Sequence, residues 1–524
     1  MPDLVNIFLN DPGTPGAPLV QVEPPRGKSP FAIPQWNGTG GLFQPGSAEF
    51  QACQLYVVLT RTYALWTDFF KRDVTWQTTA AHLPVVPRAS EEFNAYYDRQ
   101  ALKFCYATDP LTRQTVYTCE SSDVIAHECG HAILDALHPE YWDSLLSESA
   151  AFHEAFSDFS ALLAALDSPR VRALMLAENS GDLSKSNLVT RLAEQMARGL
   201  FNAGYTYAVV SPDAVRDLAN PFRYRNPMHL PARAPAARLS SESHNFSRIF
   251  SGALYDVLVG IYERLRRDNI APDDALAQAR DITGRLVAHG VLLAPKGDAL
   301  FKTMATALLT ASAQEERGKY FPIVKKALVA RRLLKGREAN QLSPGQGVLH
   351  TRTNALEGVW SVAVTRCPKW EMPVWRIGED VPALVRQRIP IPKMEFRLVT
   401  EHTWQDQTRV LYYIAPHLVR LAGESLGVAN GAVVRLFNAV TIQINADGVI
   451  VSSHHHQADR AQARRVRDHI AKLIARQRVY APAPDAVVDV RELLAQRKPY
   501  YVAYDEQGNK QIQRAFIACG TLEA

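Results

Sequence analysis

The amino-acid sequence predicts an α+β protein built from more than one unit, and three observations support this prediction. The 524 residues are 47% hydrophobic, which is enough apolar material for several cores. Helical patterns dominate from about residue 47 to 334, whereas strand patterns are more frequent after about 345. The stretch "KGREANQLSPGQG", which is poor in apolar residues, precedes this change. We therefore place a boundary near residue 340 and expect a Pro- and Gly-rich segment at 1–46, a main module at 47–340 and a separate C-terminal α+β domain of unknown function at 345–524.

The main module is expected to be mostly helical. Its first helix should span 47–72, with Ser47 as the N-cap. Residues 93–106 predict two strands joined by a turn near Asp98. The 3.6-residue spacing of apolar side chains then predicts helices at 124–137, 149–166, 187–201, 245–267, 272–289, 299–313 and 321–334.

The C-terminal part carries two hairpin patterns. In "VTIQINADGVIVSS" two apolar runs flank Asp447-Gly448, a strong turn signal. "YYVAYDEQGNKQIQRAFI" has the same organisation. A basic helix is expected between them, at 457–478.

Composition narrows the class of protein. A net charge of +5 is weak support for a polyanionic partner, so we expect no nucleic acid. Six cysteines lie scattered without paired spacing, which indicates neither a disulfide framework nor a CxxC metal site. The N-terminus lacks a basic segment before its short apolar run, and we therefore expect a cytoplasmic protein, with non-classical export left open. No run of 18 apolar residues is present, so we expect no membrane span.

The segment "VIAHECGHAIL" contains the pattern His-Glu-x-x-His. His127 and His131 are four residues apart, so both side chains project from one face of a helix and can bind one ion. Zinc accepts two imidazole nitrogens, and Glu128 beside it could take a proton from bound water. The pattern alone is weak, because an ordinary core or surface helix can carry two incidental histidines.

The next predicted helix strengthens the metal hypothesis. A catalytic zinc needs a third protein ligand, and Glu154 follows His131 by 23 residues in "SESAAFHEAFSDFSALL". Asp158 lies four residues further, on the same face. Because a zinc-bound imidazole usually donates its other N–H to a carboxylate, Asp158 could orient His127.

These patterns together resemble the thermolysin-type gluzincin metallopeptidases, over roughly residues 45–340. The resemblance rests on HExxH followed by ExxxD in "ESAAFHEAFSDF", and on the segments "FNAYYD", "VRDLANPFRYRNPMH" and "SHNFSRIFSGALYDVL". It implies a two-lobed zincin fold, with a β-rich N-terminal lobe and a helical C-terminal lobe. It also implies zinc ligands His127, His131 and Glu154, the base Glu128, a substrate-binding pair Asn94-Ala95, a carbonyl-binding Arg216 and a transition-state His244.

The resemblance further implies a hydrophobic pocket for the residue just after the cut bond, lined by Val124 and Val215. Several positions depart from the family pattern. Tyr141 is the best candidate for the tyrosine that assists the oxyanion, although the segment before Glu154 is longer than usual. His153 stands where the family often has Asn. Asp123 matches a calcium ligand, but Ala164 and Ala165 stand where an acid is expected, which leaves calcium doubtful.

The expected function is therefore that of a metalloendopeptidase with one zinc ion and a peptide or protein substrate. Two alternatives remain open. A peptidase-like binding protein would have lost the chemistry, yet Glu128 is intact. A zinc aminopeptidase would carry an upstream Gly-x-Met-Glu-Asn stretch, and the sequence has none. The sequence does not define the oligomeric state.

Overall fold

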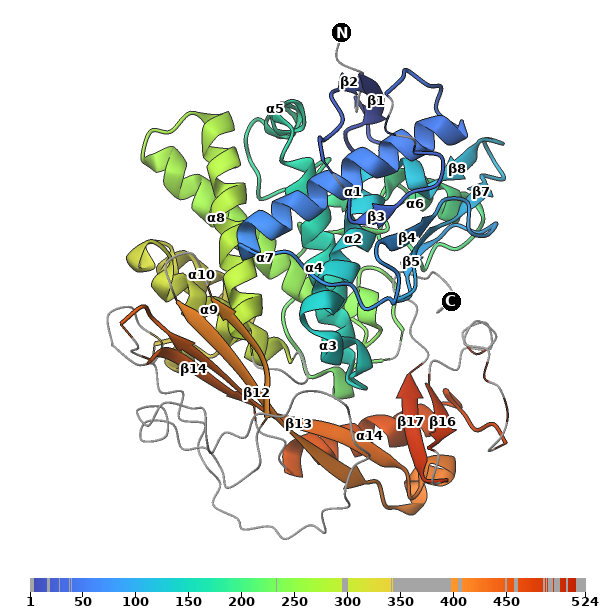
Figure 1. Ribbon diagram of the computed structural model, residues 1–524, viewed down its shortest axis with the longest axis vertical. Helices are drawn as coiled ribbons and strands as arrows, with labels where there is room; N and C mark the ends of the chain where they lie inside the picture. Colours follow the sequence, from blue (N-terminus) through green and yellow to red (C-terminus); the bar gives the residue numbers. More distant parts are fainter. Residues whose placement is uncertain are drawn as a thin grey trace.

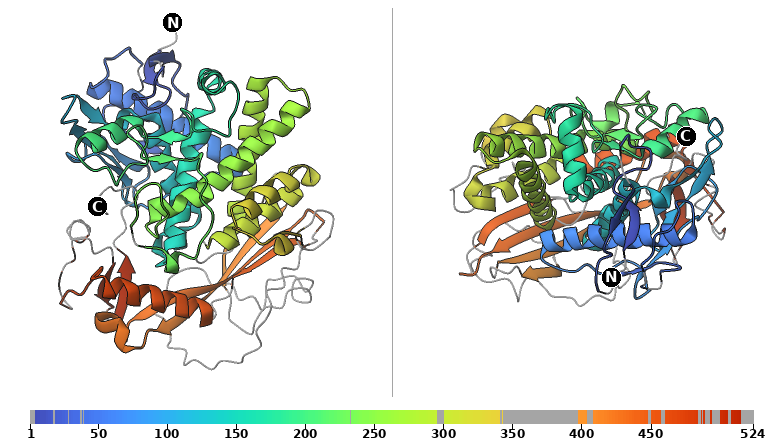
Figure 2. Two further views of the ribbon diagram at one scale, coloured as in Figure 1. Left: turned by 180° about the vertical axis from the view of Figure 1, so that it is seen from behind. Right: turned by 90° about the horizontal axis from the view of Figure 1, so that it is seen from above.

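The computed structural model describes residues 4–342 and 397–514, apart from gaps at 17–18, 28, 37, 39, 232, 295–299, 341, 404–407, 448–449, 457–459, 484–485, 487, 489–492, 494–499 and 506–507. Helices and strands are both abundant, so the predicted α+β composition is confirmed. A large helical body lies beside a C-terminal sheet whose long strands run along one side of it (Figure 1). Figure 2 shows the same two parts from behind and from above.

The N-terminal residues form strands that are integrated into the helical body. Strands β1 (Val5–Phe8) and β2 (Leu19–Val22) pair antiparallel. The side chain of Gln54 accepts a hydrogen bond from the backbone nitrogen of Phe8 at 2.9 Å. The Pro- and Gly-rich composition favours irregular, extended structure from residue 10 to 47, and β2 is a regular strand within that stretch because β1 pairs with it.

A four-stranded sheet follows the order β3-β4-β6-β5, which puts β5 at its edge. The two strands expected at 93–106 are present as β5 (Ala95–Tyr97) and β6 (Leu102–Phe104), paired antiparallel around Asp98. Strands β3 (Phe31–Ala32) and β4 (Leu83–Val86) complete the sheet. A hairpin of β7 (Tyr106–Thr108) and β8 (Thr115–Tyr117) follows it and leads into the next helix.

Helices α1 (Ala48–Phe70), α2 (Ser122–Leu137), α4 (Ser147–Ala165) and α7 (Ser243–Arg267) form the centre of the molecule. Ser47 caps α1 as expected, since its hydroxyl accepts from the backbone nitrogen of Phe50 at 3.1 Å. Helices α2 and α4 approach closely at Gly130, where a Cβ atom would come within 2.9 Å of the Cα of Ser157. Only glycine allows this contact. The contact brings the HExxH segment, which contains Gly130, close to α4.

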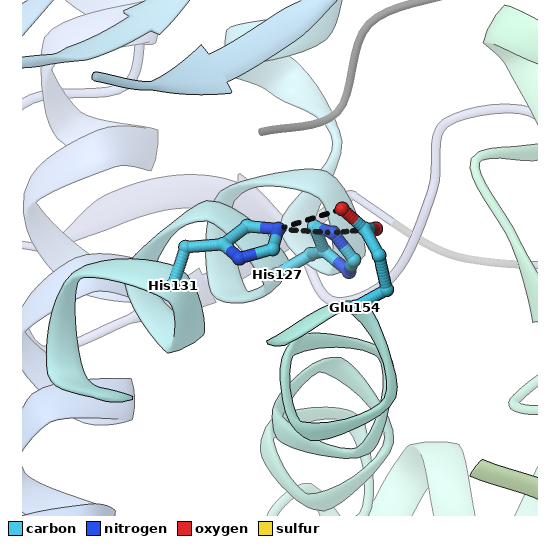
Figure 3. Close-up of side chains that lie close together, drawn as sticks. All are labelled: His127, His131 and Glu154. Carbon is cyan, nitrogen blue, oxygen red and sulfur yellow. Dashed lines mark hydrogen bonds and ion pairs between the residues drawn. The ribbon is translucent and has the colours of Figure 1, made fainter. Parts of the chain in front are cut away.

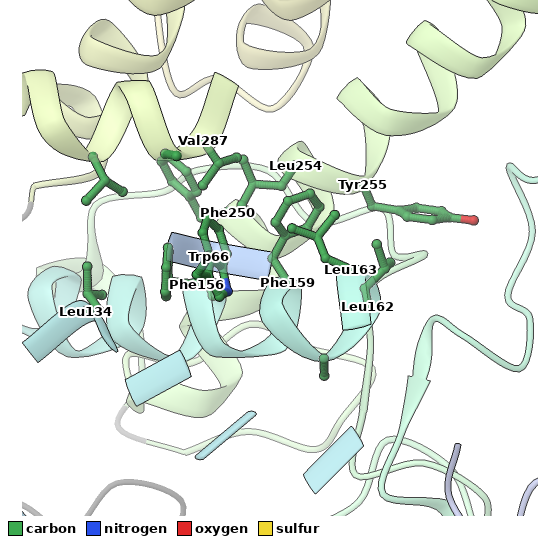
Figure 4. Close-up of a cluster of buried hydrophobic side chains, with 14 of the residues drawn as sticks. Trp66, Leu134, Phe156, Phe159, Leu162, Leu163, Phe250, Leu254, Tyr255 and Val287 are labelled. Carbon is green, nitrogen blue, oxygen red and sulfur yellow. The ribbon is translucent and has the colours of Figure 1, made fainter. Parts of the chain in front are cut away.

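The core between these helices is aromatic (Figure 4). Trp66 is fully buried and stacks on Phe156 with ring centroids 4.4 Å apart. Its indole nitrogen donates to the hydroxyl of Ser160 at 2.9 Å, so the buried donor is satisfied. Each fully buried large apolar side chain contributes about 1.5–3 kcal/mol, and this core therefore fixes the relative position of α1 and α4.

The other helices surround this centre. They are α3 (Pro139–Asp143), α5 (Pro169–Glu178), α6 (Glu194–Asn202), α8 (Pro272–Leu293), α9 (Phe301–Gln314), α10 (Phe321–Ala330) and α11 (Gly336–Asn340), together with the short 3-10 helices η1 (Thr118–Glu120), η2 (Pro227–His229) and η3 (Glu315–Gly318). The helix expected at 187–201 is wrong in its first half. There β9 (Arg191–Leu192) pairs with β10 (Arg216–Asp217), because the two segments meet across the fold.

The C-terminal part is a sheet of order β11-β12-β13-β17-β16-β15, with β14 also paired to β13. Both predicted hairpins are confirmed, since β13–β14 and β16–β17 are antiparallel pairs. The basic helix is α14 (Arg460–Ala475), shorter than expected. Residues 345–396 of the predicted C-terminal domain lie outside the described residues. The bounds of the remaining elements are β11 (Arg397–Thr403), β12 (Arg409–Arg420), η4 (Glu424–Ala429), β13 (Val433–Ile444), β14 (Ile450–His456), β15 (Val479–Tyr480), β16 (Tyr500–Tyr504) and β17 (Lys510–Arg514).

The C-terminal sheet shares a core with the helical body. Leu146, directly before α4, is buried in a cluster with apolar side chains of the C-terminal part, among them Leu436 and Ile470. The hydroxyl of Tyr500 also donates to the carbonyl of Leu145 at 3.3 Å. The two parts are therefore in contact at Leu145 and Leu146, and the separate C-terminal domain stays a prediction. The described helices include none long and apolar enough to cross a bilayer.

Candidate metal centre

Helices α2 and α4 bring His127, His131 and Glu154 together (Figure 3). One ligand atom from each lies within 4.8 Å of the others, and all three residues are buried. The two histidines face the same point because they are one helical turn apart on α2, and the close contact at Gly130 lets α4 present Glu154 to them. Among the described residues, no other group of three His, Cys, Asp or Glu side chains lies close enough together to hold a metal ion.

The distances within this group are close to those around a tetrahedral ion, although the two histidine nitrogens are nearer to each other and the histidines face different oxygens of Glu154. The two histidine Nε2 atoms are 3.1 Å apart. Nε2 of His127 lies 3.5 Å from Oε2 of Glu154, and Nε2 of His131 lies 3.6 Å from Oε1. A tetrahedral zinc with bonds of about 2.0–2.2 Å separates its ligand atoms by about 3.3–3.6 Å. Two nitrogen lone pairs and a carboxylate that converge at this spacing are a donor set suited to a borderline-soft divalent cation.

Asp158 and Arg216 both contact His127. Oδ1 of Asp158 lies 3.1 Å from Nδ1 of His127, as the sequence predicted for a residue that orients this ring. Nε of Arg216 donates to the same Asp158 oxygen at 2.7 Å, and its terminal nitrogen lies 3.7 Å from Glu154. The structure therefore brings Arg216 into the site, but it commits one of its N–H groups to Asp158.

These charges shift the pKa values of the ligand side chains. Burial and Arg216 lower the pKa of His127, but Asp158 and Glu154 outweigh them and raise it to about 8. Burial dominates at His131 and lowers the pKa of that ring well below its ordinary value. Burial opposes ionisation of Glu154, yet the histidines and Arg216 hold its pKa well below the usual range. The carboxylate is thus ready to bind a cation, which would compete with the proton on His127.

His244 reaches the site from the start of α7. Its Nε2 lies 3.4 Å from Oε1 of Glu154, and its Nδ1 contacts Oε1 of Glu242 at 2.5 Å. Burial disfavours the charged ring, but Glu154 and Glu242 raise the pKa of His244 to about 9. The two carboxylates therefore favour the protonated form of the His244 ring.

Glu242 is a site residue that the sequence reasoning missed. Its carboxylate caps α7 by accepting from the backbone nitrogens of His244 at 2.9 Å and Asn245 at 2.7 Å. The same carboxylate holds the ring of His244. An acid two residues before a histidine at a predicted helix start was the available signal, since N-cap acceptors bond to the next turn.

Glu128 follows His127 within the same turn of α2 and is 1% exposed. The backbone places it beside the ligand group, and its role as a base stays a prediction. Val124 is buried one turn earlier, and the half-buried Val215 packs against the same apolar cluster. The proposed side-chain pocket also stays a prediction.

The pair Asn94-Ala95 lies at the start of the edge strand β5, as the resemblance requires. Both residues are only 2% exposed. Oδ1 of Asn94 accepts from the backbone nitrogen of Ala95 at 2.9 Å, and the carbonyl of Asn94 accepts from Cys105 and Thr118. A bound peptide would therefore have to compete with contacts inside the chain, and the substrate-binding role stays a prediction.

Tyr141 is placed differently from the sequence-based expectation. Its ring is fully buried and stacks on His138, with centroids 4.3 Å apart. Its hydroxyl donates to the sulfur of Met304 on α9 at 3.5 Å. Because this hydroxyl is engaged with α9, we leave Tyr141 out of the catalytic group; the longer segment before Glu154 packs it into the core instead.

His153, which the sequence marked only as a departure from the family pattern, lies directly against His131. Asp123, the predicted counterpart of a calcium ligand, accepts from the backbone nitrogens of Ala193 at 2.7 Å and Val124 at 2.8 Å. It also accepts from Ser121, so its oxygens are bonded within the chain. Calcium binding at Asp123 stays doubtful, as the sequence suggested.

No known family model matches the chain, and no curated protein is significantly similar to it. The resemblance to thermolysin-type peptidases therefore rests on the sequence motifs alone and stays a prediction.

Proposed function

We propose that the protein is a zinc-dependent metalloendopeptidase of the thermolysin-like, two-lobed type, with His127, His131 and Glu154 as the ligands of one zinc ion. The observation that supports this most strongly is the convergence of these three buried side chains, with ligand atoms within 4.8 Å of one another and His244 beside them. A structural zinc site would have four protein ligands. Here three residues form the ligand group in the described chain, which is the number found in catalytic sites.

Bound zinc would supply a water of lowered pKa and would polarise the substrate carbonyl. Glu128 takes the proton of the attacking water and passes it to the leaving nitrogen. His244, held by Glu242 at Nδ1, presents Nε2–H toward the site and stabilises the oxyanion that develops on the carbonyl oxygen. Asp158 keeps Nδ1 of His127 as a donor, so that the lone pair for the metal is on Nε2.

Arg216 would serve both the metal ligands and the binding of substrate. Its bond to Asp158 fixes the guanidinium beside the ligands, and its terminal nitrogen, which contacts His127 at 3.2 Å, would have to turn from that contact to donate to a substrate carbonyl. Among the described strands β5 is the last of its sheet, and an extended peptide would bind beside it by replacing contacts that the chain makes there. Aliphatic Val124 and Val215 favour an apolar residue just after the cut bond.

The test is a metal analysis of the purified protein together with cleavage of casein and a peptide library. We expect one equivalent of zinc and endoproteolytic cleavage. Glu128→Gln should keep the fold and the zinc but lose nearly all activity, because the amide has the shape of the acid but is not a base. Cys129→Ala is the matched control, since Cys129 is buried in the same turn and should leave cleavage intact.

His131→Ala should lose the zinc. A full equivalent of zinc in that variant would contradict the ligand assignment. Wild-type protein that binds zinc yet cleaves no peptide would instead favour a peptidase-like binding protein, and release of single N-terminal residues would favour an aminopeptidase.

A further inference from the structure

His153 lies between the ligand His131 and the ring of Trp142. Nδ1 of His153 is 3.3 Å from Nδ1 of His131. The two rings are inclined by only 23°, and their centroids are 5.5 Å apart. The centroid separation exceeds the distance between the facing nitrogens by about the sum of two ring radii, so the rings meet edge to edge, nearly in one plane. This is the geometry of a hydrogen bond along the line of the two nitrogens, not of a stack.

A hydrogen bond between two imidazole nitrogens needs one donor and one acceptor. A neutral imidazole carries a single proton, on one of its nitrogens. Nε2 of His131 faces Glu154 and His127 and would give its lone pair to the metal. The proton of His131 must then be on Nδ1, and Nδ1 of His153 must accept it.

We propose that His153 is a positioning residue for the metal centre, which accepts the Nδ1 proton of His131 and thereby fixes both the tautomer and the plane of that ligand. This inference rests on the proposed zinc site and deepens it. The two histidine ligands are then supported differently, His127 by the carboxylate of Asp158 and His131 by a neutral imidazole. A carboxylate is the stronger acceptor, so His131 is the less basic ligand of the two.

The surroundings hold His153 in this plane. Trp142 on α3 packs against its ring at 83°, with centroids 5.7 Å apart. The guanidinium of Arg99 lies 5.4 Å from the centroid of the Trp142 ring, and Arg99 also pairs with Asp135 of α2 at 2.8 Å. His153 itself is fully buried on α4. The ring is thus held from both sides, as a residue that orients a ligand must be.

The test is zinc affinity of the full-length protein, measured by competition with a chelator. His153→Leu fills a similar volume but offers no acceptor, and it should weaken zinc binding by about 10–100-fold. His153→Asn offers an amide oxygen and should restore most of the affinity. Ser160→Ala is the matched control, since it removes a buried hydroxyl from the same helix that bonds to Trp66 and to no metal ligand. It should lower stability to urea but leave zinc affinity unchanged.

A second measurement keeps the proposal testable if His153→Leu does not fold. Nitrogen-15 NMR of the zinc-loaded wild-type protein should show the His153 proton on Nε2 and the His131 proton on Nδ1. A proton on Nδ1 of His153, or wild-type zinc affinity in folded His153→Leu, would overturn the assignment while leaving the proposed function intact. Absence of zinc binding by the wild type would defeat the proposed function itself.

Discussion

We predict that Asp11→Asn makes the protein more stable above neutral pH. Asp11 and Asp123 lie on either side of Ser121, whose hydroxyl contacts Oδ2 of Asp11 at 2.7 Å and also Oδ1 of Asp123. A hydroxyl has one proton and can donate to only one carboxylate. The second contact is a hydrogen bond only if the other carboxyl is protonated and donates to the Ser121 oxygen. One of the two carboxyl groups is therefore protonated, in addition to the Ser121 hydroxyl.

The surrounding contacts indicate that Asp11 holds this proton. Asp123 accepts from two backbone N–H groups and lies in the first turn of α2, where the helix dipole favours a negative charge. Oδ1 of Asp11 accepts from Gly13 and Gln195, which leaves Oδ2 to carry the proton toward Ser121. The other charged groups nearby are Glu194, which is paired with Arg191 at 2.9 Å, and His127 one turn along α2.

The sign and size of the effect follow from this proton. Burial and the charge of Asp123 raise the pKa of Asp11 from 3.8 to about 8. Between these values the folded protein keeps a proton that the unfolded chain releases. Stability from this group is therefore fully present below pH 3.8 and is lost as the pH rises to about 8. Each pH unit in this window costs about 1.4 kcal/mol, or about 4 kcal/mol from pH 5 to pH 8 for one independent group. Because Asp11 and Asp123 share one proton and titrate as a pair, we assign half of this value to Asp11, about 2 kcal/mol.

An asparagine at position 11 copies the protonated acid, since its oxygen can accept from the two backbone groups while its amide donates to Ser121. Urea unfolding of the zinc-loaded protein at pH 5 and pH 8 measures the effect. The variant should gain about 2 kcal/mol over wild type between these pH values, whereas Asp123→Asn should be destabilised at both, because it places an amide donor against donors. The proton assignment would be refuted if the difference in unfolding free energy between Asp11→Asn and wild type were the same at pH 5 and pH 8. It would also be refuted if Asp123→Asn were more stable than wild type.

Three further predictions concern the metal centre. Asp158→Ala should weaken zinc binding by about 10–100-fold, because His127 loses the acceptor at Nδ1; chelator competition measures this, and unchanged affinity would contradict the role of Asp158. Glu242→Gln should lower kcat without releasing zinc, because His244 loses the carboxylate that holds and charges its ring; steady-state kinetics beside metal analysis checks this. Peptide-library digestion should show cleavage before Leu, Ile, Val or Phe, and cleavage mainly before Asp, Lys or Gly would contradict the pocket lined by Val124 and Val215.

Local rules of the chain explain the features that were predictable from sequence. His127 and His131 share a face because a helix repeats every 3.6 residues, and Ser47 caps α1 because its hydroxyl reaches the next turn. The two C-terminal hairpins follow from turn residues between apolar runs. The pairing of Asp158 with His127 was also expected, because it uses the same helical spacing as Glu154 and needs only that α4 face α2.

Contacts between distant segments depend on packing, and these only the tertiary structure decided. The sequence identified Arg216 by resemblance but gave no sign that it would bond to Asp158, 58 residues away. Tyr141 was expected at the metal centre, yet stacking on His138 and a contact with Met304 place it in the core. The sequence also suggested a separable C-terminal domain, whereas Leu146 and Tyr500 join the two parts.

The same distinction applies to the ligand group itself. The sequence by itself determined which side chains of α2 could share an ion, because their spacing along one helix sets their direction. It did not determine that Glu154 would lie 3.5 Å from His127, or that the ring of His153 would meet His131 edge to edge. Those distances depend on how closely α2 and α4 approach at Gly130, and the approach of two helices is set by the side chains of every element packed around them.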